Sequence, residues 1–179
     1  VKPAAAEGAK PPFWKGEWKG RGIETGKAFG AIFRRLAAAH ESGQLVEELK
    51  GLSLDDIAAD KAADLIRHQL AVTQVLPDDR NMVIEHFCNE SGDYQMVVHS
   101  IFGRRVNAPL ATLLQLEAKR ILDSEVYCVD EENGLLLYTY DETMIPERLL
   151  QNIDISTAVD RLKAVLPATP LFSMTFRYN

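Results

Sequence analysis

Residues 82–101 read Met-Val-Ile-Glu-His-Phe-Cys-Asn-Glu-Ser-Gly-Asp-Tyr-Gln-Met-Val-Val-His-Ser-Ile, and they rule out an all-helical chain. Residues 82–89 and 94–101 are both rich in β-branched and aromatic side chains, which favour strands. Between them stands Glu90-Ser91-Gly92-Asp93, a set of turn-forming residues. The stretch therefore predicts a β-hairpin.

A second hairpin is expected further along the chain. Residues 126–129 and 135–140 flank Asp-Glu-Glu-Asn-Gly at 130–134, and the pair Asn133-Gly134 suits turn positions with positive φ. Between the two hairpins, Asn107 can cap a helix that has Pro109 in its first turn. Four apolar residues share one face of that helix: Leu110, Leu113, Leu114 and Ile121.

The remaining elements are helical. A helix is expected at 25–40, with an inward face of Phe29, Ile32, Phe33 and Leu36, while Arg34 and Arg35 point away. A short helix follows at 44–50, and Ser53 begins a capping box for a longer helix that reaches about residue 75. Pro146 opens a short helix, and another covers 157–166 with three inward residues, Val159, Leu162 and Leu166.

These elements define an α+β fold in which N-terminal helices precede two β-hairpins that form a mixed sheet with packed helices. The sequence leaves open whether the hairpins combine into one sheet or a barrel. The length of 179 residues suits one domain. We expect residues 1–12, with three prolines, to be a linker or arm and residues 13–179 to be the domain. No apolar run is long enough for a membrane span or a signal peptide, so a cytoplasmic protein is expected.

Charge is distributed unevenly along the chain. The net charge is −6, but residues 1–35 hold eight basic and three acidic side chains, a net of +5, so the remainder sums to −11. This places any surface that faces a polyanion near the N-terminal segment. A soluble basic tail is the equally weighted alternative.

The motifs of catalysis are missing from the sequence. No window matches the phosphate-binding loop or the Gly-x-Ser-x-Gly elbow, and Cys88 and Cys128 lack metal-site spacing. A zinc site at His86, Cys88 and His99 would need a hairpin register that turns all three to one face, and we expect none. The chain is therefore expected to hold no catalytic residue, metal or cofactor, although an independent small-ligand enzyme with a deep pocket remains an alternative.

The segment from Pro12 to Arg21 is the first candidate for nucleic-acid contact. A flat aromatic ring beside cations can stack on a base while the cations contact phosphate. The candidates here are Trp14, Lys15, Lys19 and Arg21. The alternative is that Phe13 and Trp14 pin the arm onto the domain surface.

The pair Arg104 and Arg105 is the second candidate. Both guanidinium groups stand just before the expected helix N-terminus, a combination that suits an anion. The alternative is that both arginines pair with the abundant local carboxylates.

Several ordered motifs resemble the DEAD/H-associated domain of the Lhr-type (large helicase-related) ATP-dependent helicases. They are Phe13-Trp14-Lys15-Gly16-Glu17 with Gly20-Arg21, Gly26-Lys27-Ala28-Phe29-Gly30-Ala31, and Val83-Ile84-Glu85-His86-Phe87 leading to Val97-Val98-His99-Ser100-Ile101-Phe102-Gly103-Arg104-Arg105-Val106-Asn107. The final Phe176-Arg177-Tyr178-Asn179 resembles the family's C-terminal motif, after which those proteins continue, so the domain is expected to be truncated here.

This resemblance implies an accessory domain of a 3′-to-5′ translocase that unwinds DNA or RNA–DNA duplexes and is linked to DNA repair. ATP and magnesium would act in RecA-like motor domains of the parent chain, which also has a winged helix. The domain would pack on the second motor domain and help guide the loading single strand, with Trp14 near the duplex junction and Trp18 less favoured. The alternative is a regulatory, protein-interaction module whose acidic surface docks a motor domain without touching nucleic acid.

Overall fold

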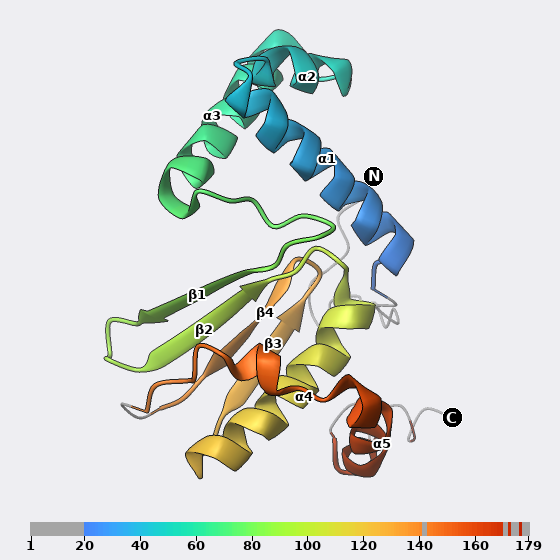
Figure 1. The fold of residues 1–179 in the computed structure, drawn as a ribbon, viewed down its shortest axis with the longest axis vertical. Coiled ribbons are helices and arrows are strands. Elements are labelled where there is room, and N and C mark those ends of the chain that lie inside the picture. The colour runs from blue at the N-terminus through green and yellow to red at the C-terminus, as the bar shows by residue number, and fades with distance from the viewer. Residues whose placement is uncertain (1–19, 141–142, 170–171, 173–175, 177–179) are drawn as a thin grey trace, which may run out of the picture.

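Three helices at one end of the molecule stand above a four-stranded sheet in the computed structural model (Figure 1). The structure describes residues 20–140, 143–169, 172 and 176. The helices are α1 (Ile23–Glu41), α2 (Leu45–Gly51) and α3 (Asp56–Thr73), and they precede the sheet as the sequence predicts. Their shared core consists of Leu36, Leu45, Leu49, Ala59 and Ala63.

The buried face of helix α1 differs from the predicted one. Phe29 is 44% exposed, because the helix approaches the rest of the chain through Gly26 and Gly30 instead. The Phe29 ring lies under the guanidinium of Arg21, 5.1 Å from ring centroid to Cζ. Arg34, expected to point away, donates two hydrogen bonds of 3.1 Å to the Asp79 carboxylate.

The two hairpins are confirmed and join into one open sheet. Strands β1 (Val83–Cys88) and β2 (Tyr94–His99) form the first hairpin, and β3 (Tyr127–Glu131) and β4 (Gly134–Tyr138) form the second. The order is β1-β2-β4-β3 with every pair antiparallel, so the sheet is neither mixed nor closed into a barrel. The α+β class is confirmed.

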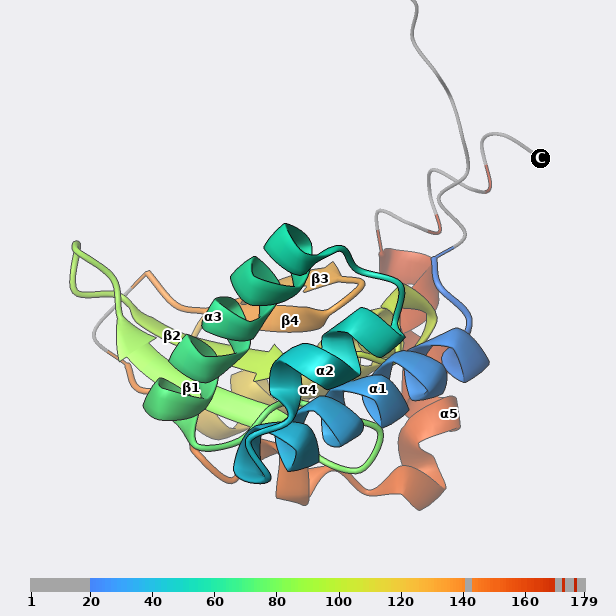
Figure 2. The ribbon, with the colours of Figure 1, turned by 90° about the horizontal axis from the view of Figure 1, so that it is seen from above.

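One face of this sheet carries the larger hydrophobic core. Helix α4 (Arg104–Leu122) packs on β3 and β4, and Leu114 and Ala118 meet Met96, Val98 and Leu137 there. The 3-10 helix η1 (Leu149–Asn152) and helix α5 (Ile155–Val165) then contact α4, and η2 (Leu166–Ala168) follows α5. Viewed from above, α3 and α5 lie on opposite sides of the molecule (Figure 2).

Helix starts are where the sequence interpretation was least accurate. Asn107 lies inside α4 and not at its N-cap, because the chain reverses at Gly103 (φ +88°) and the helix begins at Arg104. Asp55, not Ser53, caps α3, and its carboxylate accepts a 2.8 Å hydrogen bond from the Ala58 amide. Asp154 caps α5, whose expected inward residues Val159 and Leu166 are 60% and 44% exposed.

The turn of the second hairpin also differs from the expectation. Glu131 pairs with Gly134, so the loop is Glu132-Asn133, and neither Asn133 nor Gly134 adopts a positive φ. Gly134 has another reason to be glycine. A Cβ there would lie 2.5 Å from the carbonyl oxygen of Val98 on the neighbouring strand.

Within the part of the chain that the structure describes, no helix is both long enough and apolar enough to cross a bilayer.

Candidate nucleic-acid interface

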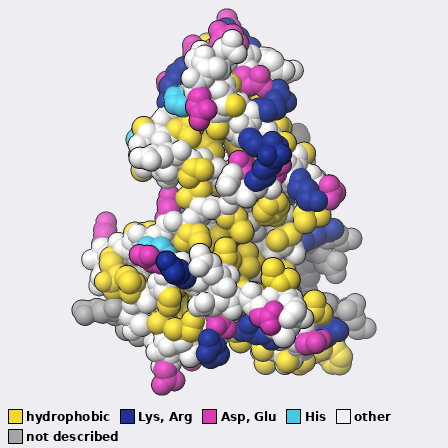
Figure 3. Space-filling view, in the orientation of Figure 1, with side chains coloured by type: hydrophobic (Ala, Val, Ile, Leu, Met, Phe, Trp, Pro, Cys, Tyr) yellow, Lys and Arg dark blue, Asp and Glu magenta, His cyan; other side chains and the backbone are white. Residues whose placement is uncertain are grey.

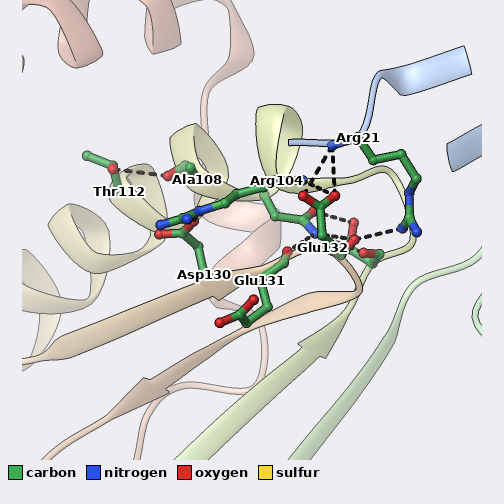
Figure 4. A network of polar contacts seen from close by, with 9 residues as sticks. Arg21, Arg104, Ala108, Thr112, Asp130, Glu131 and Glu132 are labelled. Carbon is green, nitrogen blue, oxygen red and sulfur yellow. Dashed lines mark hydrogen bonds and ion pairs between the residues drawn. The ribbon is translucent and has the colours of Figure 1, made fainter. Parts of the chain in front are cut away.

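Arg21 connects the N-terminal segment to the turn of the second hairpin. Its Nη2 donates hydrogen bonds to the carbonyl oxygens of Ile101 (2.7 Å) and Glu132 (2.8 Å) and to Oδ1 of Asn133 (2.9 Å). Its backbone N–H points at the Glu132 carboxylate, 2.9 and 3.1 Å from the two oxygens (Figure 4). Hydrogen bonds with a charged partner are the stronger kind, so this contact fixes the chain where it enters α1.

Two glycines make room for this contact. Gly103 has φ +88°, and a Cβ there would lie 2.5 Å from the Arg21 carbonyl oxygen. Gly20 has φ +69°, and a Cβ there would lie 3.1 Å from the Cβ of Arg104. Both positions favour glycine because their φ is positive, and at Gly103 the Arg21 backbone also lies too close for a side chain.

Arg104 belongs to the same network. Its backbone N–H donates to Glu132 Oε2 (3.2 Å), and its Nε donates to Asp130 Oδ2 (2.6 Å). The hydrogen bond and the charge of Asp130 raise the pKa of the Arg104 guanidinium above its ordinary value. The alternative that Arg104 pairs with a local carboxylate is therefore what the structure shows, while Arg105 follows as an exposed residue.

The other sequence-selected residues of this site, Trp14, Lys15 and Lys19, lie outside the described residues. Three further cations, which the sequence analysis did not propose as site residues, lie along α1, where dark-blue side chains form a row (Figure 3). Lys27 pairs with Glu24 at 3.1 Å, Arg34 with Asp79, and Arg35 with Glu48. The helix expected at 25–40 already placed all three on one element.

The hairpin register excludes the zinc alternative. His86 pairs with Met96 and Cys88 with Tyr94, whereas His99 pairs with Val83 and therefore lies on the opposite face of the sheet. Its Nε2 lies 3.2 Å from Oε2 of Glu85. Within the described residues, no cluster of three or more His, Cys, Asp or Glu side chains could hold a metal ion.

The fold and the site together define a class: an α+β domain with an open antiparallel sheet whose second hairpin binds Arg21 just before α1. Comparison with known proteins identifies the family. Residues 76–179 match the DEAD/H associated family, so the chain belongs to it, as the resemblance implied. Helices α1 to α3 lie before the matched region.

Two curated relatives extend the likeness. The chain is 33% identical over 132 residues (74% of its length) to "Lhr helicase/ probable uracil glycosylase" of Mycolicibacterium smegmatis, and it covers 8% of that protein. It is 26% identical over 179 residues (99% of its length) to "Lhr helicase/uracil glycosylase" of Escherichia coli, covering 11%. The chain thus spans about a tenth of the length of these relatives.

A solved structure has the same fold. The structure of Mycobacterium smegmatis helicase Lhr bound to ssDNA and AMP-PNP matches 96% of this chain with a TM-score of 0.77 and 26% identity, and the match covers 22% of that chain. Because nearly the whole chain is matched, the similarity to that structure includes both the N-terminal helices and the sheet. The chain is therefore a DEAD/H associated domain of the Lhr type.

Proposed function

We propose that this chain is the accessory domain of an ATP-dependent 3′-to-5′ DNA or RNA–DNA helicase and helps guide the loading single strand at the duplex junction. The observation that carries this proposal is the match of 96% of the chain to a helicase that was solved with ssDNA bound. ATP hydrolysis with magnesium would take place in motor domains elsewhere in the longer polypeptide. This domain would pack on the second RecA-like motor domain and lie near the winged helix.

The N-terminal segment is the part of the domain that we assign to the strand. Trp14 would stack on a base, and Lys15 and Lys19 would contact phosphates, since aromatic rings and cations together bind single strands without sequence preference. Arg21 would hold this segment in place, because its Nη2 already makes three hydrogen bonds within the domain. The cations of α1 would extend the positive surface.

Arg104 and Arg105 are proposed as additional phosphate contacts. A guanidinium has five N–H donors, so the bond from Arg104 Nε to Asp130 does not by itself prevent a contact with phosphate. Both arginines stand in the first turn of α4, where the helix dipole favours an anion.

Replacement of Trp14 in the longer helicase tests this function. Stacking contributes about 1–3 kcal/mol per base, so Trp14→Ala should slow unwinding roughly 5- to 150-fold. ATPase activity without DNA should stay unchanged, and the control Trp18→Ala should have a smaller effect. Unwinding by Trp14→Ala at the wild-type rate would remove the proposed role.

A second candidate is a protein-interaction module without direct strand contact. It is favoured by the use of both guanidinium groups inside the domain: Arg21 donates to the carbonyl oxygens of Ile101 and Glu132, and Arg104 donates to Asp130. In that case Trp14→Ala leaves unwinding intact, whereas charge reversals on the acidic surface impair it.

A further inference from the structure

The four-stranded sheet has one face that no described helix covers. Side chains alternate along a strand, so the sheet register assigns every strand residue to one of two faces. The inner face carries Met96, Val98 and Leu137 and packs on α4. The outer face consists of the odd-numbered residues of β1, β2 and β3 and the even-numbered residues of β4.

The outer face exposes apolar side chains on its two edge strands, β1 and β3. Phe87, Tyr127 and Val129 are 43%, 40% and 46% exposed. At one end of this face three tyrosine rings stand together: Tyr127 stacks on Tyr138 with ring centroids 5.4 Å apart, and Tyr140 meets both edge-on at 5.1 and 5.4 Å. Exposed apolar patches of this kind mark interaction surfaces.

The charged side chains of the strands indicate which kind of partner fits the outer face. None of the four strands contains a lysine or arginine. The outer face carries two carboxylates, Glu85, which lies 3.2 Å from His99 Nε2 on the same face, and Glu131. A nucleic-acid strand needs cations to neutralise its phosphates, so this face is unsuited to it. It is suited to an apolar protein surface with lysine and arginine side chains at its rim.

The size of the face suits a contact between domains of one chain. Four strands about 4.8 Å apart, each five or six residues long with a rise of about 3.4 Å, present roughly 300 Å². Interfaces between domains of one polypeptide bury about 600–1,500 Å² in total, counted over both domains. The area of this face therefore matches one domain's share of the smallest such interfaces. The relatives are about ten times longer than this chain, so they have room for further domains that could supply the partner surface.

We propose that the outer face of the sheet docks another domain of the same, longer polypeptide through an apolar surface rimmed by lysine and arginine. This inference rests on the proposed function, in which the chain is one domain of a helicase. The strand contact is assigned to different residues from those of the sheet face, so either proposal can fail while the other holds.

Oxidative footprinting of the tyrosines tests the docking. The side chains of Tyr127 and Tyr140 are labelled by hydroxyl radicals in this 179-residue chain and in the longer polypeptide. We expect labelling to fall at least fivefold in the longer polypeptide, while the exposed Ile57 of α3 serves as reference. Equal labelling of the tyrosines in both proteins overturns the proposal.

Other occupants would give different results, and each overturns the proposal. Protection that is already present in the dilute 179-residue chain points to its own N-terminal segment, and protection that grows with its concentration points to a second copy. Protection of the 179-residue chain that appears only when single-stranded DNA is added points to nucleic acid.

Charge substitutions of Val129, on the edge strand β3 of this face, test the nature of the partner. In binding of the 179-residue chain to the rest of the polypeptide, Val129→Lys should weaken affinity at least tenfold, and Val129→Glu distinctly less. Val72→Lys on α3, where the valine is 68% exposed, is the matched control and should leave affinity unchanged. Equal loss for lysine and glutamate contradicts the cationic rim. Unwinding by Trp14→Ala reports separately on the proposed function.

Discussion

Asn107 is fully buried, and its side chain joins three segments of the domain. Its Nδ2 donates to the carbonyl oxygens of Ser100 (2.9 Å) and Glu131 (2.8 Å), and its Oδ1 accepts from Ser100 Oγ (2.7 Å). Asn107→Ala leaves these buried groups unpaired, so we expect the free energy of unfolding to fall by about 1–3 kcal/mol in urea denaturation. The exposed Asn152→Ala is the control, and an equal effect of both would refute the connecting role.

Glu132 and Glu131 are adjacent carboxylates with different surroundings. Glu132 accepts the backbone N–H groups of Arg21 and Arg104, whereas the Glu131 side chain points away from them (Figure 4). Glu132→Gln should lower the free energy of unfolding by about 1–2 kcal/mol, and Glu131→Gln should change it little.

The same pair of variants reports on the N-terminal segment. Trp14 and Trp18 are the two tryptophans of the chain, so fluorescence anisotropy measures this segment alone. We expect lower anisotropy in Glu132→Gln than in Glu131→Gln. Identical anisotropy would mean that the Arg21 contact does not hold the segment.

The sequence pointed to individual residues of the site but not to their partners. The sequence singled out Arg21 and Asn107, but their partners Glu132 and Glu131 lie 111 and 24 residues away. Only the folded sheet brings them together. His99 likewise depended on the hairpin register, which local patterns do not determine.

At the scale of the element, α1 depends on close backbone contact. A Cβ on Gly26 would lie 2.6 Å from Cα of Phe102, and one on Gly30 would lie 2.2 Å from the Asp79 amide nitrogen. Alanine usually stabilises a helix interior by about 0.5–1 kcal/mol relative to glycine, but here the overlap should reverse the sign. Thermal denaturation should show Gly26→Ala and Gly30→Ala less stable than wild type.

Gly51, at the end of α2, is the control for this prediction. Nothing lies within 4 Å of a Cβ built there, so Gly51→Ala should be neutral or slightly stabilising. Stabilisation by Gly30→Ala similar to that by Gly51→Ala would show that α1 does not rest against residues 79 and 101–102.

Helix α5 is held to α4 through Glu117, a buried carboxylate that accepts from Arg120 (2.6 Å) and Arg161 (3.0 Å). The hydrogen bond from Arg120, and then that from Arg161, lower the pKa of Glu117 below its ordinary 4.5. A lowered pKa in the folded state means that the stabilisation is present above pH 4.5 and is lost as the pH falls through the folded pKa.

We therefore expect the free energy of unfolding to decrease on acidification below pH 4.5, and Glu117→Gln to weaken that dependence. Urea denaturation between pH 7 and pH 3 measures it. Glu125→Gln, in an exposed pair with Lys119, should retain the wild-type slope. An unchanged slope in Glu117→Gln would show that this carboxylate does not couple α5 to α4.

The elements themselves were largely predictable, since both hairpins and the main helices follow from the spacing of apolar residues. Helix starts were not, because α4 begins at a left-handed Gly103 that no capping pattern announces. The expected face of α1 was wrong at Phe29 because two glycines, which add nothing to an apolar stripe, make the closest contacts.

For the whole molecule, the sequence predicted the class and the resemblance predicted the family, but neither determined the sheet order. The two hairpins join through the antiparallel pairing of β2 with β4, two strands that lie far apart in the sequence. The net charge of −6 conceals a cationic N-terminal part and an acidic remainder, and this asymmetry underlies the proposed division between strand contact and domain docking.

Crosslinking of a bound strand in the longer helicase tests the central claim most directly. Single-stranded DNA that contains 5-iododeoxyuridine is bound with AMP-PNP, irradiated, and the crosslinked peptides are identified by mass spectrometry. We expect crosslinks within residues 13–35 of this domain, with Trp14 foremost. Crosslinks confined to other parts of the polypeptide would contradict it.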